Sequence, residues 1–131
     1  MEQHTQGTVR VIKFRAVYEG KIYEVTELMW SDLTVTLWDG KHAEVQVVGI
    51  ADVPLLQFTG LTDKNGVEIY EGDVVRFRSH PSPMRVAKVL FDQKSARFMA
   101  DHTDGSGWDS FQHHNHLEVI GNIYENTELL K

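Results

Sequence analysis

Hydrophobic and polar residues alternate through most of the chain, which is the period of a β-strand. The clearest example is residues 33–38, where Leu33, Val35 and Leu37 alternate with threonines and are expected to share one face. Asp39-Gly40 follows, a pair that readily adopts positive φ, so residues 43–48 are expected to form the returning strand of a hairpin. This pattern indicates β structure.

Further turn signals divide the rest of the chain into short strands. Asn65-Gly66 is the strongest two-residue hairpin signal in the sequence. Residues 85–91 and 96–100 read as a second hairpin, and residues 117–123 as a last strand. Helical periodicity is weak, with residues 110–116 and 127–130 as short candidates.

The sequence therefore predicts a mainly β fold with little helix, in one domain that spans residues 1–131. Pro54 and a change of rhythm near residue 58 divide it into two halves. The C-terminal half, about residues 59–126, is expected to form a small SH3-like barrel. The N-terminal strands, about residues 9–58, are expected to pack against it, because neither half alone buries much core.

Composition indicates a soluble protein of the cytoplasm. The first eight residues are polar and lack the apolar region of a secretory signal, and no apolar run is long enough to span a membrane. Cysteine is absent, so neither disulfides nor thiolate chemistry is expected.

The net charge of −6 disfavours strong nonspecific binding to nucleic acid, but the charge is unevenly distributed. Residues 76–97 hold six basic side chains (Lys or Arg) against the single acidic side chain of Asp92. These bases are either the solvated faces of successive strands or a patch that faces a polyanion. The candidate residues for nucleic-acid binding are Arg76, Arg78, Arg85, Lys88 and Trp108.

Three blocks of sequence resemble the YopX family of phage and prophage proteins. The core signature is carried by residues 56–66 and 68–75, the opening by residues 12–16, and the close by residues 119–126. Thr127 departs from the proline common at that place, and residues 80–116 are the least family-like part. The resemblance implies a compact, self-associating, phage-associated protein, and it carries over no catalytic or ligand-binding residue.

Histidines near the C-terminus are the only candidates for a metal site. On a helix only His113 and His116 would share a face, and on a strand His114 and His116 would do so instead. Since the recognised zinc signatures are missing, a structural or surface role is favoured and no metal or other cofactor is expected.

No motif indicates an enzyme. The carboxylates Glu68, Glu71 and Asp73 are interpreted as the solvated rim of a hairpin, and no serine lies in a nucleophile motif. Trp30, Trp38 and Trp108 are either stacking platforms for bases or apolar contacts, and for Trp38 we expect a place in the core.

The sequence thus favours a phage accessory protein of unknown molecular function that acts through protein contacts, including contacts with itself. Its partner would be an unknown host or phage protein, and the alternative is a small barrel that binds nucleic acid weakly through residues 76–97. Self-association is expected because unpaired strand edges must be covered, with residues 9–16 and 117–123 as the predicted outer strands. Trp30 and Tyr18 are the candidates for contact residues.

Overall fold

The structure, a computed structural model, describes residues 9–41, 45–78, 83–110 and 116–130. The described residues form strands and two short 3-10 helices: β1 (Phe14–Tyr18), β2 (Lys21–Met29), β3 (Thr34–Trp38), β4 (Val45–Gly49), η1 (Ile50–Asp52), β5 (Leu55–Thr62), β6 (Glu68–Tyr70), β7 (Asp73–Arg78), β8 (Met84–Asp92), β9 (Arg97–His102), β10 (Trp108–Asp109), β11 (Glu118–Asn122) and η3 (Thr127–Leu130).

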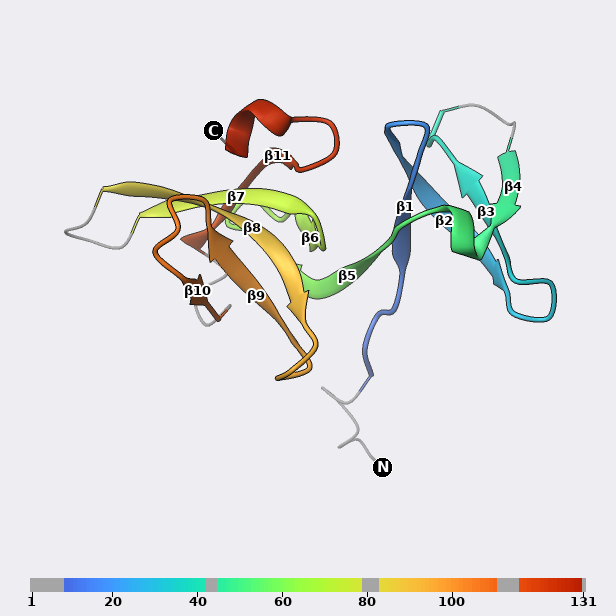
Figure 1. The fold of residues 1–131 in the computed structure, drawn as a ribbon, viewed down its shortest axis with the longest axis horizontal. Coiled ribbons are helices and arrows are strands. Elements are labelled where there is room, and N and C mark those ends of the chain that lie inside the picture. The colour runs from blue at the N-terminus through green and yellow to red at the C-terminus, as the bar shows by residue number, and fades with distance from the viewer. Residues whose placement is uncertain (1–8, 42–44, 79–82, 111–115, 131) are drawn as a thin grey trace.

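The strands build two antiparallel sheets that lie side by side (Figure 1). One sheet has the order β4-β3-β2-β1-β5-β6 and the other has the order β10-β9-β8-β7-β11. The prediction of a mainly β fold with little helix is confirmed. Both sheets are open, and the structure does not show a closed barrel.

The first four strands enclose a small core of their own. Ala16, Val35, Leu37 and Val53 are buried in it, and Val35 and Leu37 point to the same side of β3 as the alternation predicts. Backbone hydrogen bonds from Val17 N to Pro54 O (3.1 Å) and from Ile50 N to Leu33 O (2.8 Å) hold the segment between β4 and β5 against this sheet.

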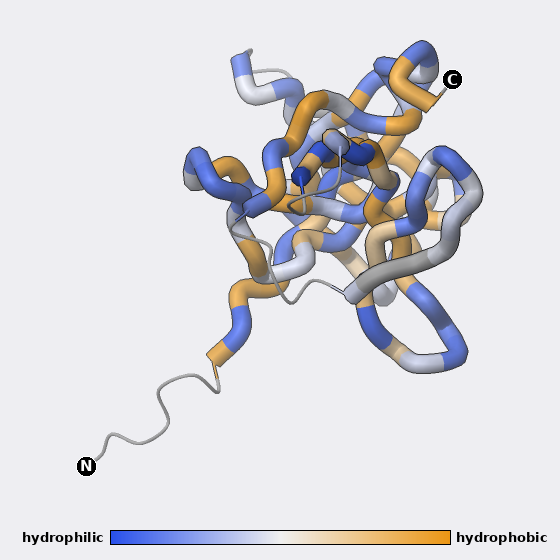
Figure 2. Tube along the Cα trace, turned by 90° about the vertical axis from the view of Figure 1, so that its left-hand side faces the viewer, coloured by the Kyte–Doolittle hydropathy of each residue, from blue (hydrophilic) through white to orange (hydrophobic). Residues whose placement is uncertain are grey.

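The second core belongs to both sheets. Val75, Ala87, Val89 and Ala100 of the five-stranded sheet pack with Ile69 of β6, and Leu117 completes the cluster. Because β6 is the last strand of the other sheet, this shared core fixes the β5–β6 hairpin on the face of the five-stranded sheet. Figure 2 shows hydrophilic positions at several outer turns, and hydrophobic positions along the strands and on the segment before β1.

Strand β5 connects the two halves. It pairs with β1 at residues 55–57 and with β6 through Phe58 and Thr62, with an irregularity between these two pairs. The boundary predicted near residue 58 therefore falls inside one continuous strand. Gly60 has φ +88°, which glycine adopts without strain, and it lies in the irregular part of the pairing.

Three details of the sequence prediction are wrong. Leu33 does not share the buried face of Val35, because it belongs to the turn before β3, has φ +54° and is 60% exposed. Trp38 follows the inward-facing Leu37, so strand alternation turns it to the outer face, where it is 36% exposed. Residues 9–16 are not an outer strand, because β1 lies between β2 and β5.

The hairpin turns are predicted correctly. Asn65-Gly66 lies in the turn between β5 and β6, with φ +79° at Gly66. Residues 93–96 connect β8 to β9, and β11 is an outer strand as expected. Residues 127–130 form a single 3-10 turn, whereas residues 111–115 of the other helix candidate lie outside the described residues.

Gly72 provides a test of the junction between the halves. It has φ +85°, and a Cβ atom there would lie 3.0 Å from Cε2 of Tyr124. Gly20 has a similar φ of +78° with open space around it. Both Gly72→Ala and Gly20→Ala should lose about 1 kcal/mol through backbone strain, and Gly72→Ala should lose about 1 kcal/mol more through crowding. Urea unfolding of the two variants measures the difference, and equal losses would show that Tyr124 moves freely.

Candidate functional site

A cluster of charged and aromatic side chains lies where the start of β1 meets β5 and β6. The Lys13 ammonium pairs with the Glu68 carboxylate and stands 5.0 Å from the centre of the Phe58 ring. The Arg15 guanidinium lies 4.0 Å from the centre of the Tyr70 ring. These contacts are cation–π interactions, which favour a cation over the face of an aromatic ring.

The cluster is continuous across the strands. The Phe58 and Tyr70 rings are 5.4 Å apart, and Arg15 Nε donates to Glu24 Oε2 of β2 at 2.8 Å. Strands β1 and β2 are therefore connected to the distant β5 and β6 through side chains as well as through backbone pairing. The arrangement holds strands β1–β4, which we call the N-terminal sheet, against the β5–β6 hairpin, which carries the YopX-like signature.

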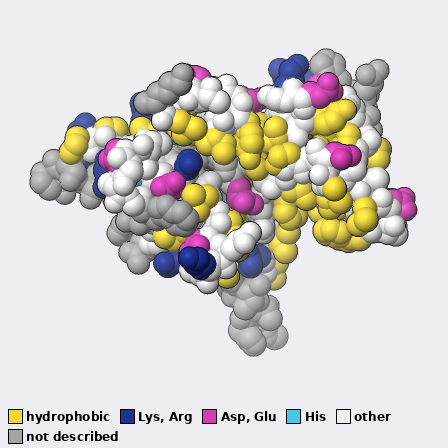
Figure 3. Space-filling view, viewed as in Figure 1, with side chains coloured by type: hydrophobic (Ala, Val, Ile, Leu, Met, Phe, Trp, Pro, Cys, Tyr) yellow, Lys and Arg dark blue, Asp and Glu magenta, His cyan; other side chains and the backbone are white. Residues whose placement is uncertain are grey.

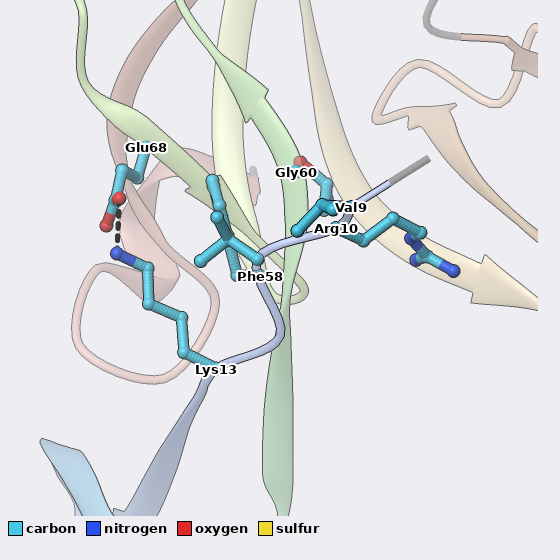
Figure 4. A pocket seen from close by; sticks show the side chains of 8 residues that line it. Val9, Arg10, Lys13, Phe58, Gly60 and Glu68 are labelled. Atoms are coloured by element: carbon cyan, nitrogen blue, oxygen red, sulfur yellow. Dashed lines mark hydrogen bonds and ion pairs between the residues drawn. The ribbon is translucent and has the colours of Figure 1, made fainter. Parts of the chain in front are cut away.

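An open pocket of about 520 Å³ adjoins this cluster (Figure 4). It lies between the segment before β1 and strand β5, and its lining residues are Val9, Arg10, Val11, Lys13, Phe58, Thr59, Gly60 and Glu68. Among the described residues the lining holds a single carboxylate, Glu68, which pairs with Lys13. A second carboxylate, the usual partner in paired acid–base chemistry, is not part of the lining in the described residues.

Asp73 lies behind the cluster and is only 6% exposed. Burial raises the pKa of its carboxyl to about 6, although the hydrogen bond from Tyr70 N and the nearby Arg15 charge act in the opposite direction. The interpretation of Glu68, Glu71 and Asp73 as a solvated rim is therefore wrong for Asp73. Glu71 also has a structural contact, since its Oε1 accepts from Gln57 N at 3.0 Å.

Asp63 is the second buried carboxylate, and its surroundings have the opposite effect. Its Oδ1 accepts from Asn65 N and Val67 N at 2.8 and 2.9 Å, and its Oδ2 accepts from Val119 N at 2.9 Å. Burial acts to raise the pKa of this carboxyl, but the three backbone donors and Lys64 outweigh it and hold the pKa below its ordinary value. Asp63 is thus ionised and structural at neutral pH.

The predicted basic residues do not share one face of the five-stranded sheet. Arg76, Arg78 and Lys88 project from one face, whereas Arg85 pairs with Phe77 and projects from the other. Arg76 Nε lies 2.7 Å from Glu118 Oε1, and Lys88 Nζ lies 3.7 Å from Asp101 Oδ2. Acids of neighbouring strands thus offset part of the charge.

Arg85 has its own partners in the loop after β9. Its Nη2 bonds to the Ser106 hydroxyl and lies 3.8 Å from Asp104 Oδ2. Trp108 is in β10, and its side chain lies outside what the structure describes. The interpretation as a nucleic-acid surface stays a prediction.

The histidines give no metal site in the part of the chain that is described. His116 is exposed, and His113 and His114 lie outside the described residues. No three His, Asp or Glu side chains converge among the residues in view in a way that would hold a metal ion. The expectation that the protein has no metal or other cofactor remains a prediction.

Sequence reasoning missed the roles of Asp63, Asp73 and Arg15. An Asp two residues before Asn-Gly is a usual side-chain acceptor for the turn, so the sequence itself could have indicated the local role of Asp63. The sequence gives no indication of the hydrogen bond from Val119 N to Asp63, because the two residues are 56 positions apart. Arg15 was visible only as one cation in an alternating segment.

Comparison with known proteins identifies the family. A family model described as YopX protein matches residues 13–131. The chain belongs to the YopX family. The match covers the shared core, the Asp63 turn and the cation–aromatic cluster, so these features lie within the YopX domain.

The crystal structure of protein EF1440 from Enterococcus faecalis is similar to this YopX-family chain, with 27% sequence identity and a TM-score of 0.60. The similarity covers 94% of this chain and 100% of the other. No curated protein matches the chain significantly. Within the residues in view, no helix of the YopX-family chain is long and apolar enough to cross a bilayer.

The raised pKa of Asp73 predicts a change of stability with pH. A group whose pKa is about 6 when folded and near 3.8 when unfolded stabilises the fold below pH 4 and loses that contribution as the pH rises through 6. Asp73→Asn keeps an acceptor for Tyr70 N and has no charge to bury. It should therefore match the parent near pH 4 and exceed its unfolding free energy by about 2–3 kcal/mol at pH 7.5.

Denaturant unfolding at the two pH values measures this difference. Asp32→Asn, at an exposed turn residue, is the control for the loss of one negative charge. A parent that is more stable than Asp73→Asn at pH 7.5 would contradict the account.

Proposed function

We propose that this YopX-family chain is a phage or prophage accessory protein of the bacterial cytoplasm that acts through protein–protein contacts, including contacts with its own copies, and not as an enzyme. Membership of the YopX family supports the phage association. The arrangement of apolar side chains on the N-terminal sheet supports action through protein contacts.

The turn between β2 and β3 is the observation that carries the proposal. Leu33 adopts a left-handed backbone conformation, with φ +54°, and presents its side chain to solvent. That conformation costs a non-glycine residue about 1 kcal/mol, and leucine gains nothing from exposure. Trp30 at the other end of the same turn is 67% exposed.

A strained turn that displays two large apolar side chains is unfavourable for the isolated fold. Strain of this kind is usually kept at sites that contact something else. Met29 and Val47 are further exposed apolar side chains on the same sheet, and Figure 3 shows hydrophobic side chains over this half of the molecule. We call Met29, Trp30, Leu33 and Val47 the apolar surface. Tryptophan in particular is enriched where protein contacts are strong.

The SH3-like barrel is the form that we propose for the C-terminal half. The turn of the β5–β6 hairpin meets the outer strand β11 through Lys64 N to Leu117 O, at 3.0 Å, and through the Asp63–Val119 bond. These contacts bring the edge of one sheet against the edge of the other. They support a barrel that closes at this seam.

Binding of nucleic acid is the alternative. Two observations count against this alternative: Arg76 and Lys88 form ion pairs with acids, and Arg85 lies on the opposite face of the sheet. Any such binding should be electrostatic and should fall steeply with salt. Fluorescence anisotropy with a labelled single strand at two salt concentrations tests this, and sequence-specific binding that persists at high salt would contradict this interpretation of the charge pattern.

Leu33→Asn separates the effect of this turn on the stability of the fold from its effect on self-association. Asparagine tolerates positive φ better than leucine does, so the variant should gain about 0.5–1 kcal/mol in unfolding free energy. It should also lose self-association, measured by light scattering after gel filtration. Glu19→Asn is the matched control, because Glu19 is an exposed turn residue with φ +51° and no apolar side chain.

Glu19→Asn should gain similar stability and keep the oligomer. The parent protein should exceed the 15.0 kDa mass of one chain at micromolar concentration. A parent that stays at the monomer mass up to near-millimolar concentration would refute self-association.

A further inference from the structure

The four terminal strands of the two sheets, in the described part of the chain, differ in how their edges are protected. Natural proteins protect an edge strand by shortening it, bulging it or placing charges on it. Strand β6 has three residues and β10 has two. Strand β11 carries Glu118 and an irregularity between Val119 and Gly121.

Strand β4 has none of these protections. It runs for five residues, Val-Gln-Val-Val-Gly, and pairs with β3 in unbroken register from Trp38↔Val45 to Thr34↔Gly49. It contains no charge, no proline and no bulge. Its other side has no strand partner within the chain as described.

We propose that β4 pairs antiparallel with β4 of a second copy, about a two-fold axis near Val47. The pairing joins two six-stranded sheets into one continuous sheet. The inference rests on the self-association proposed above and adds the surface through which it occurs.

The chemistry of the strand favours a second copy as its partner. Across a two-fold axis a strand meets its own sequence in reverse, so any charge on it would face a like charge or lie near one. An uncharged strand avoids that repulsion. With Val47 at the axis, Gln46 of one copy lies opposite Val48 of the other, and no ionised group of β4 itself (Val45–Gly49) is desolvated.

The side chains beside β4 would add apolar contact. Val47 is 63% exposed and lies on the outer face opposite Thr36. Leu33 adjoins the end of the strand, since its carbonyl accepts from Ile50 N. The edge is thus continuous with the apolar surface through Val47 and Leu33.

A charge at the axis tests the pairing. Val47→Lys should leave the fold intact, because the side chain is exposed, and should reduce the mass in solution by about half or more, since two ammonium groups would meet across the axis. Met84→Lys is the matched control, because Met84 is an exposed apolar residue on β8 of the other sheet. Circular dichroism of each variant verifies folding.

Cross-linking gives a second measurement that does not depend on weakening the protein. The chain has no cysteine, so a single substitution yields a unique thiol. Directly opposed residues of an antiparallel pair have Cα atoms about 4.5–5.5 Å apart, within the range of a disulfide. Val47→Cys should therefore form a covalent dimer under mild oxidation at low micromolar concentration, and Met84→Cys should not.

The outcomes separate the two proposals. A parent that is monomeric at all concentrations overturns self-association and the β4 pairing together. An oligomeric parent whose mass is unchanged in Val47→Lys, or whose Val47→Cys variant cross-links no faster than Met84→Cys, overturns the β4 pairing and leaves self-association in place.

Discussion

The fold depends on one buried carboxylate. Asp63 stands at the end of β5 and accepts three backbone hydrogen bonds, two from its own turn and one from Val119 of β11. The first two fix the turn that sends the chain back as β6. The third connects that turn to the last strand of the other sheet, so a single ionised side chain determines both a local and a long-range feature.

The arrangement of the two halves follows from this connection. With the turn held against β11, Ile69 of β6 packs into the core of the five-stranded sheet. Strand β5 then carries the β1 strand beside it, and Lys13 and Arg15 of that region reach the Phe58 and Tyr70 rings. Strands β1–β4 are in this way held to the same hairpin, while no described strand of the chain pairs with the far edge of β4.

Local features of this fold could be predicted from the sequence, and long-range ones could not. Strand period and turn residues correctly gave the hairpins at Asn65-Gly66 and at residues 93–96, because these depend on neighbouring residues alone. The position of β1 inside its sheet depends on which strands pair, and alternation carries no information on pairing. Burial of Asp73 was missed for the same reason.

The candidate site shows the same limit. Charges were visible in the sequence, but their partners were not, since Arg76 and Glu118 are 42 positions apart and Lys13 and Glu68 are 55 apart. The segment that seemed most basic is partly neutralised in the fold. The apolar edge at β4, which carries the self-association inference, is defined by the absence of a neighbouring strand in the described structure, and only the topology reveals that.

The unfolding free energy of Asp63→Asn at pH 7 tests the central claim most directly. The amide keeps one acceptor oxygen, but its NH₂ group would face a backbone donor, so at least one buried N–H is left without a bond. We expect a loss of about 2–3 kcal/mol relative to the parent, with Asp32→Asn unchanged as the exposed control. Because the pKa of Asp63 is lowered in the fold, the parent's advantage should shrink as the pH falls below about 4. A variant as stable as the parent at pH 7 would contradict the account.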